Sequence, residues 1–170
     1  MERSRMPGPG EPAADPGPDA LPPHLWTVAE ANARLDDLRQ LLPQLRSWAS
    51  RLAEVHTELR RLAQFWGEEL EARDHPDHGP SSRLEAEWRN LARRLDEAVG
   101  ALREEGIEVK QLEGGLVDFY AMVDGELALL CWRLDEPRVG FYHSLHGGFS
   151  GRRPLPTGRP SVPTDARGSL

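Results

Sequence analysis

The residues with the clearest chemical potential lie close together in the sequence, in the segment 131–152. His143 and His146 are three residues apart, Glu136 precedes them, and three glycines stand within the five residues 147–151. Imidazole and carboxylate groups are ligands for zinc, iron, nickel and manganese, and glycine lets the backbone approach an ion closely. The spacing predicts a site for a divalent transition metal, built from Glu136, His143 and His146.

The same part of the chain has an excess of positive charge that suits a small anionic ligand. Residues 133–170 carry six arginines against three acidic residues, although the whole chain has a formal net charge of −7. Arg152 lies next to glycine-rich backbone, which favours the binding of a carboxylate or a phosphate. The sequence leaves the alternative open that these charges only keep the surface solvated.

A predicted β-hairpin must position several of these groups. Asp124 and Gly125 separate residues 116–123 from residues 126–133, and Asp-Gly is a strong signal for a two-residue hairpin turn. Such a turn fixes the register, so that the two runs pair residue by residue from the turn outwards. One face of the hairpin is then apolar and suits packing on helices, and the opposite face carries the polar side chains.

The polar face of this hairpin is the predicted small-ligand site. It combines apolar walls with a few polar groups, as binding sites for small molecules do. Simple pairing of the next strand places Gly140 opposite Cys131 and leaves a gap there. The residues that we expect to bind the ligand are Asp118, Cys131, Arg133, Tyr142 and Arg152. The alternative is structural, with an ion pair between Asp118 and Arg133 beside a small buried cysteine.

The first half of the chain predicts two helices that form an antiparallel hairpin. Residues 27–30 match a helix-capping box, and leucines then recur at spacings of three and four residues. A second box at 82–85 opens a shorter helix that ends at Gly106. Pro43 falls inside the first helix, so we expect a kink or a break there. The shorter helix leaves the stripe 35–42 uncovered, and this stripe must pack on the sheet or on a second subunit.

These elements together predict an α+β fold. The folded domain covers residues 24–155, with the helices in 27–106 and an antiparallel β-meander of three to four strands in 107–155. The flanking segments 1–23 and 156–170 are rich in proline and glycine and poor in apolar residues. Such segments bury too little surface to offset the entropy lost on ordering, so we expect both tails to be disordered.

The composition excludes several classes of protein. A chain of 170 residues with a single cysteine cannot form an internal disulfide framework, and a lone thiol suits the reducing cytoplasm. No apolar run approaches the roughly 18 residues that a membrane helix needs. The acidic net charge argues against binding to nucleic acid by broad electrostatic attraction. We therefore expect a cytoplasmic protein that binds neither membranes nor nucleic acid.

Three segments taken together resemble a known family. They are residues 27–32 at the start of the first helix, residues 115–119 at the start of the hairpin, and Cys-Trp-Arg at 131–133 followed by 136–152. They resemble the bacterial family called domain of unknown function 2203, over about residues 25–155. The resemblance implies no known reaction. It supports the domain boundaries and points to the C-terminal loop as the region of interest.

Two functions are compatible with these observations. The first is a binding protein that associates with itself, as a dimer formed through the helices, because the apolar stripe of the first helix is longer than its partner helix and the sequence contains no complete catalytic set. The second is a protein that binds a small molecule or a metal in the sheet and loop 131–152. The sequence leaves open whether this second protein is an enzyme.

Overall fold

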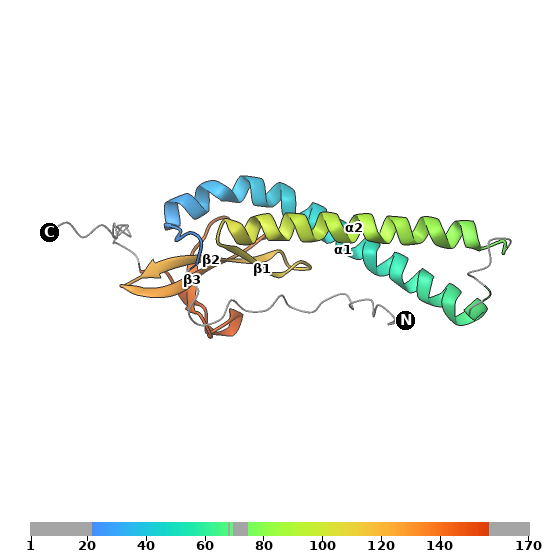
Figure 1. Ribbon diagram of the computed structural model, residues 1–170. Helices are drawn as coiled ribbons and strands as arrows, with labels where there is room; N and C mark the ends of the chain where they lie inside the picture. Colours follow the sequence, from blue (N-terminus) through green and yellow to red (C-terminus); the bar gives the residue numbers. More distant parts are fainter. Residues whose placement is uncertain (1–21, 68, 70–74, 157–170) are drawn as a thin grey trace.

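The computed structural model describes residues 22–67, 69 and 75–156. Two helices, α1 (Val28–Trp66) and α2 (His78–Glu104), lie on one side of a small sheet and extend beyond it as a hairpin (Figure 1). This is the predicted α+β order of elements. The predicted disordered tails, 1–23 and 156–170, lie almost wholly outside the described residues. Among those residues no helix is both long and apolar enough to cross a bilayer.

Helix α1 begins at the predicted capping box and continues through Pro43. The Thr27 hydroxyl accepts a hydrogen bond from the Glu30 backbone amide (3.2 Å), and the Glu30 carboxylate accepts one from the Thr27 amide (2.8 Å). Of the two alternatives at Pro43, a break is wrong, because the helix is continuous from Val28 to Trp66. Figure 1 shows α1 changing direction between its blue first part and its teal last part. A bend relieves the clash of an internal proline ring with the preceding helical turn.

Helix α2 starts earlier than the capping pattern predicts. Its first residue is His78, and Asp77 in the N-cap position makes no side-chain cap, so the predicted capping box at 82–85 does not form. A turn closed by the His78 amide and the His75 carbonyl oxygen (3.0 Å) leads into the helix instead. Pro80 is tolerated because amides in the first helical turn have no partner inside the helix.

The sheet has five antiparallel strands in the order β1-β2-β3-β4-β5. The strands are β1 (Ile107–Gln111), β2 (Leu116–Val123), β3 (Glu126–Arg133), β4 (Phe141–Ser144) and β5 (Arg153–Pro154). The meander is as predicted but has one strand more, since β5 follows the short 3-10 helix η2 (Phe149–Gly151). A register shift between Val109 and Gln111 interrupts the pairing of β1 with β2.

The core lies between the sheet and the first half of α1. Leu35, Leu38 and Leu42 are at most 2% exposed and belong to one buried cluster with Phe119 and Trp132. The apolar stripe that the sequence left without a helical partner therefore packs on the sheet. The length of this stripe therefore does not indicate a second subunit.

The loop between β3 and β4 corrects one predicted register. Cys131 pairs with Phe141 and not with Gly140, so β4 is displaced by one residue from simple pairing. The cause is Val139, which is 2% exposed and leaves the strand for the core, where its amide donates to the Asn32 side-chain oxygen (3.0 Å). Because side chains alternate along a strand, this shift exchanges the faces of all β4 residues.

Two glycines of the sheet provide a matched test of this fold. Gly115 and Gly125 both have a positive φ (+61° and +84°), but a Cβ at Gly115 would lie 2.7 Å from the Leu134 Cβ, whereas one at Gly125 would meet nothing within 4 Å. The positive φ alone costs a non-glycine residue about 1–2 kcal/mol, and overpacking adds about 1–3 kcal/mol. We expect Gly115→Ala to lower the free energy of unfolding at least about twice as much as Gly125→Ala in urea titrations. Equal losses would contradict the close packing of Gly115 on Leu134.

Candidate functional site

Three buried side chains from three adjacent strands meet on the face of the sheet opposite to the helices. Asp118 on β2 lies directly across from Cys131 on β3, as the hairpin register predicts. His143 on β4 reaches the same place because of the one-residue shift in its strand. One ligand atom from each residue lies within 4.8 Å of the other two, and all three residues are at most 2% exposed. We call this group the Asp-Cys-His cluster.

The orientation of His143 is fixed by the backbone. Its Nδ1 lies 2.7 Å from the carbonyl oxygen of Ser144, which can only accept, so Nδ1 carries a hydrogen. In the neutral ring Nε2 then presents its lone pair, and it does so 3.2 Å from Asp118 Oδ2. A proton or a metal ion between Nε2 and the carboxyl group satisfies both atoms.

Burial dominates the electrostatics of the cluster. It raises the pKa of the Asp118 carboxyl, because a carboxylate loses its hydration there. Burial, and after it the neighbouring Asp118 carboxylate, raises the pKa of the Cys131 thiol to about 12. Burial therefore disfavours the ionised form of both groups relative to the same groups in water, and a cation bound beside them would offset this effect. The second carboxyl oxygen, Asp118 Oδ1, has no nitrogen or oxygen hydrogen-bond partner among the described residues, although the Cys131 thiol hydrogen-bonds to this carboxyl group.

A second polar group, built around Arg152, borders the cluster. Arg152 Nη2 donates to Glu136 Oε2 (2.7 Å) and to the carbonyl oxygen of Cys131 (3.2 Å). Its guanidinium carbon lies 4.4 Å from the centre of the Phe141 ring and 4.8 Å from that of Phe149. Figure 1 shows this C-terminal segment, in orange to red, on the side of the sheet away from the helices.

The structure regroups the residues that the sequence singled out. The predicted metal set of Glu136, His143 and His146 does not come together: Glu136 pairs with Arg152, and His146 is exposed. Among the described residues, the one cluster of three or more possible metal ligands is Asp118, Cys131 and His143. Two members of it were predicted as ligand-binding residues and the third as a metal ligand.

Two other predicted ligand-binding residues lie elsewhere. Tyr142 pairs with Leu130 and packs against the core on the helical side, because the register shift turned it away from Cys131. The Arg133 side chain forms an ion pair with Asp135 (2.5 Å) instead of one with Asp118. The structural alternative of an Asp118–Arg133 pair is therefore wrong.

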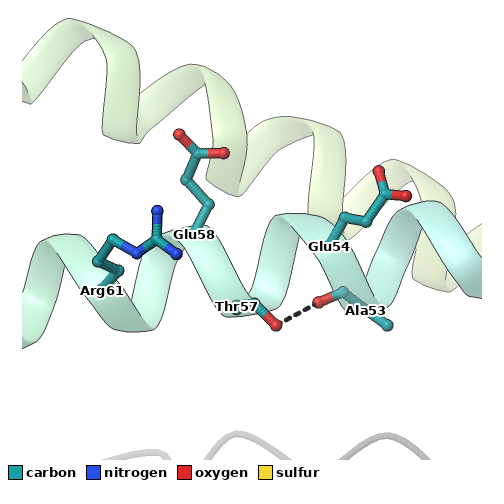
Figure 2. A pocket seen from close by; sticks show the side chains of 5 residues that line it. All are labelled: Ala53, Glu54, Thr57, Glu58 and Arg61. Atoms are coloured by element: carbon teal, nitrogen blue, oxygen red, sulfur yellow. Dashed lines mark hydrogen bonds between the residues drawn. The ribbon is translucent and has the colours of Figure 1, made fainter.

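A hollow on the outside of α1 does not form a convergent site. It is lined by side chains of a single helix: Ala53, Glu54, Thr57, Glu58 and Arg61. Figure 2 shows these side chains pointing in different directions, with the Thr57 hydroxyl bonded to the Ala53 carbonyl oxygen (2.8 Å). All five positions lie on an exposed helical surface, so we assign the hollow no function.

A family model matches most of the chain. The family model described as "Uncharacterized conserved protein (DUF2203)" matches residues 24–155, which is the whole predicted domain. This chain belongs to the DUF2203 family. No curated protein and no solved structure matches it. For this DUF2203 protein, function must therefore be argued from the cluster itself.

The sequence indicates all three residues of the cluster, but through two separate patterns. Asp118 and Cys131 follow from the hairpin register alone, and His143 was noticed only through its spacing from His146. His143 reaches Asp118 and Cys131 because Val139 lies in the core and β4 is shifted by one residue. The number of loop residues does not predict this shift. The contact of Arg152 with Phe141 and Phe149 was also missed, because it depends on η2 folding back over the sheet.

The burial of the cluster predicts an unreactive cysteine. Since only the thiolate attacks disulfide reagents, a buried thiol with a pKa of about 12 should react at least about a hundredfold more slowly with dithionitrobenzoate in the native protein than after denaturation. Absorbance of the released thionitrobenzoate measures the rate. Complete reaction of the native protein at the denatured rate would contradict this environment.

Proposed function

We propose that this protein binds a divalent transition metal of the zinc class at the Asp-Cys-His cluster. The observation that carries the proposal is a set of three buried ligand atoms within 4.8 Å of one another, one of them a carboxyl oxygen whose neighbour, Oδ1, has no nitrogen or oxygen partner among the described residues. A buried polar atom without a partner costs about 1–3 kcal/mol, so such atoms often mark sites that bind something further. We also propose the bacterial cytoplasm as the location, because zinc-binding thiols there stay reduced.

The donor set favours zinc over harder ions. Thiolate and imidazole ligands suit zinc, whereas magnesium and calcium prefer oxygen ligands alone. The hydrogen bond from His143 Nδ1 to the Ser144 carbonyl is the usual support of a metal-binding histidine, since it orients the ring and leaves Nε2 available. The deprotonation of Cys131 and Asp118 that burial opposes would be driven by the charge of the ion.

The spacing of the ligand atoms also supports a metal. Typical zinc–nitrogen and zinc–oxygen bond lengths imply about 3.3 Å between nitrogen and oxygen in a tetrahedral site. The separation of His143 Nε2 and Asp118 Oδ2 is 3.2 Å. Because the ligand atoms are up to 4.8 Å apart, the more distant ones would have to approach one another by about 1 Å to complete a site with three protein ligands. Three protein ligands leave the fourth position of a tetrahedral ion open to another molecule.

Metal analysis of isosteric variants tests this proposal. We expect untagged protein to bind an equimolar amount of zinc, and Asp118→Asn or Cys131→Ser to weaken zinc affinity more than about tenfold. Asp118→Asn keeps a group that can donate to His143 Nε2, so the loss is due to the anionic ligand and not to the fold. Competition with a chromophoric chelator measures affinity, and circular dichroism checks the fold.

His146→Gln is the matched control. It removes an exposed histidine three residues from His143 and should leave zinc affinity unchanged. If His146→Gln weakened zinc affinity as much as Asp118→Asn does, the result would favour the metal set predicted from sequence spacing, which includes His146. Failure of the wild-type protein to retain zinc against the chelator would overturn the proposal.

A second function, association into a homodimer through the helices, is favoured by a different observation. Along the part of the hairpin that extends beyond the sheet, several apolar side chains are only half-buried, namely Leu59, Leu62, Leu84, Trp88 and Leu91. Near the tip of α1, Phe65 is 76% exposed. Two helices alone cannot enclose a core, and a second hairpin packed on the first would cover these side chains as a four-helix bundle.

Light scattering during size-exclusion chromatography tests the dimer. We expect a dimer at micromolar concentration and a dissociation constant raised at least about tenfold by Phe65→Asp, because a charge would be buried at the interface. Leu145→Asp is the control, since Leu145 is 42% exposed but belongs to the sheet end of the molecule. A strictly monomeric wild-type protein at micromolar concentration would exclude this function.

A further inference from the structure

Two buried polar atoms without partners lie on either side of Cys131. Among the described residues, the buried side-chain nitrogen and oxygen atoms that lack a hydrogen bond are Asp118 Oδ1 and Arg152 Nε. Asp118 faces Cys131 across the β2–β3 ladder, and Arg152 donates to the Cys131 carbonyl oxygen. One atom is an acceptor without a nitrogen or oxygen donor, and the other is a donor without an acceptor. A metal alone would satisfy only the first.

Some hydrogen-bond donors of the Arg152 guanidinium fix its position, and the others have no partner among the described residues. Nη2 makes both of its hydrogen bonds, to Glu136 and to Cys131, while Nε and Nη1 make none with the described residues. Phe141 and Phe149 lie close to the guanidinium, and the Arg152 side chain is 11% exposed. An arginine restrained by aromatic rings and one carboxylate, with donors to spare, is preorganised to accept an oxyanion.

The position of Arg152 relates these spare donors to the metal site. Phe141, which packs against the guanidinium, is the β4 residue opposite Cys131, and Cys131 is the residue opposite Asp118. Asp118, Cys131 and Phe141 thus form one row across the sheet, and Arg152 lies over the end of that row.

We infer that the metal held by the Asp-Cys-His cluster carries a small oxyanion, a carboxylate or a phosphate, as its fourth ligand, and that Arg152 binds this anion through Nε and Nη1. The inference rests on the proposed metal site. In this arrangement one anion oxygen coordinates the ion in place of water, and another accepts the hydrogen bonds of Arg152. The metal ion would neutralise the Asp118 carboxylate, and the anion would accept the hydrogen bonds of Arg152. Glu136 orients Arg152 from the other side through Nη2.

Cobalt substitution of the full chain tests this inference. Tetrahedral Co²⁺ with a thiolate ligand absorbs visible light, and its spectrum changes when the fourth ligand is exchanged. We expect acetate and inorganic phosphate each to shift the spectrum of the Co²⁺ protein in a saturable manner. Acetamide, at the same ionic strength, should leave the spectrum unchanged, because it has no charge for Arg152.

Matched variants assign the effect to Arg152. Arg152→Gln should weaken acetate binding at least about tenfold while it changes Co²⁺ affinity less than about threefold. Arg153→Gln is the control, because Arg153 is the exposed neighbour that pairs with Tyr142 and should bind acetate like wild type. If Arg152→Gln fails to fold by circular dichroism, Arg152→Lys replaces it, since lysine keeps the charge but lacks the Nε donor.

The outcomes separate the two proposals. Binding of Co²⁺ with a spectrum that no anion perturbs would overturn the anion site and leave the metal site standing. Equal acetate affinity in wild type and Arg152→Gln would overturn the role of Arg152. Absence of Co²⁺ and Zn²⁺ binding by the wild-type chain would overturn the metal site and this inference with it.

Discussion

The register of the β2–β3 hairpin is the constraint on which the rest of the structure depends. The turn at Asp124 and Gly125 pairs the two strands without interruption over eight residues each. Because successive side chains alternate, this one register puts Phe119 and Trp132 under α1 and Asp118 and Cys131 on the other face. A slip of a single residue would turn the Asp118 carboxyl away from His143 and into the leucine layer, where it would be buried without that partner. The core and the cluster therefore specify the same pairing.

Much of the fold could be predicted from local patterns. The capping box at Thr27, the heptad spacing of the leucines and the Asp-Gly turn each act over a few residues, and the structure contains all three as expected. The features that could not be predicted depend on distant contacts. Val139 lies outside β4 and in the core, where its amide donates to Asn32, and α1 continues through Pro43 with a leucine on either side of it, Leu42 and Leu45, buried in the same core cluster. Local helix and strand preferences are weak, and such packing between distant residues overrides them.

The candidate site illustrates the same division between local and distant information. The sequence supplied the chemically capable residue types, but it grouped His143 with its sequence neighbours Glu136 and His146. In the folded chain the pairing of strands, and not spacing along the sequence, determines the neighbours of His143. It brings His143 to Cys131 and Asp118, which lie 12 and 25 residues earlier in the sequence. The Glu136 carboxylate has a structural partner in Arg152 and accepts a hydrogen bond from the Arg133 amide (2.9 Å), so it is committed to the end of β3.

The two borders of the sheet have a consequence for how copies of this protein can meet. Unpaired strand borders invite another chain to add a strand, and proteins block this with irregular pairing, lysine, proline or very short strands. Here β1 carries the register shift next to Lys110, and β5 is two residues long and ends in Pro154. Both borders are thus poor templates for a foreign strand. Growth of the sheet from one molecule into the next by strand addition is therefore disfavoured.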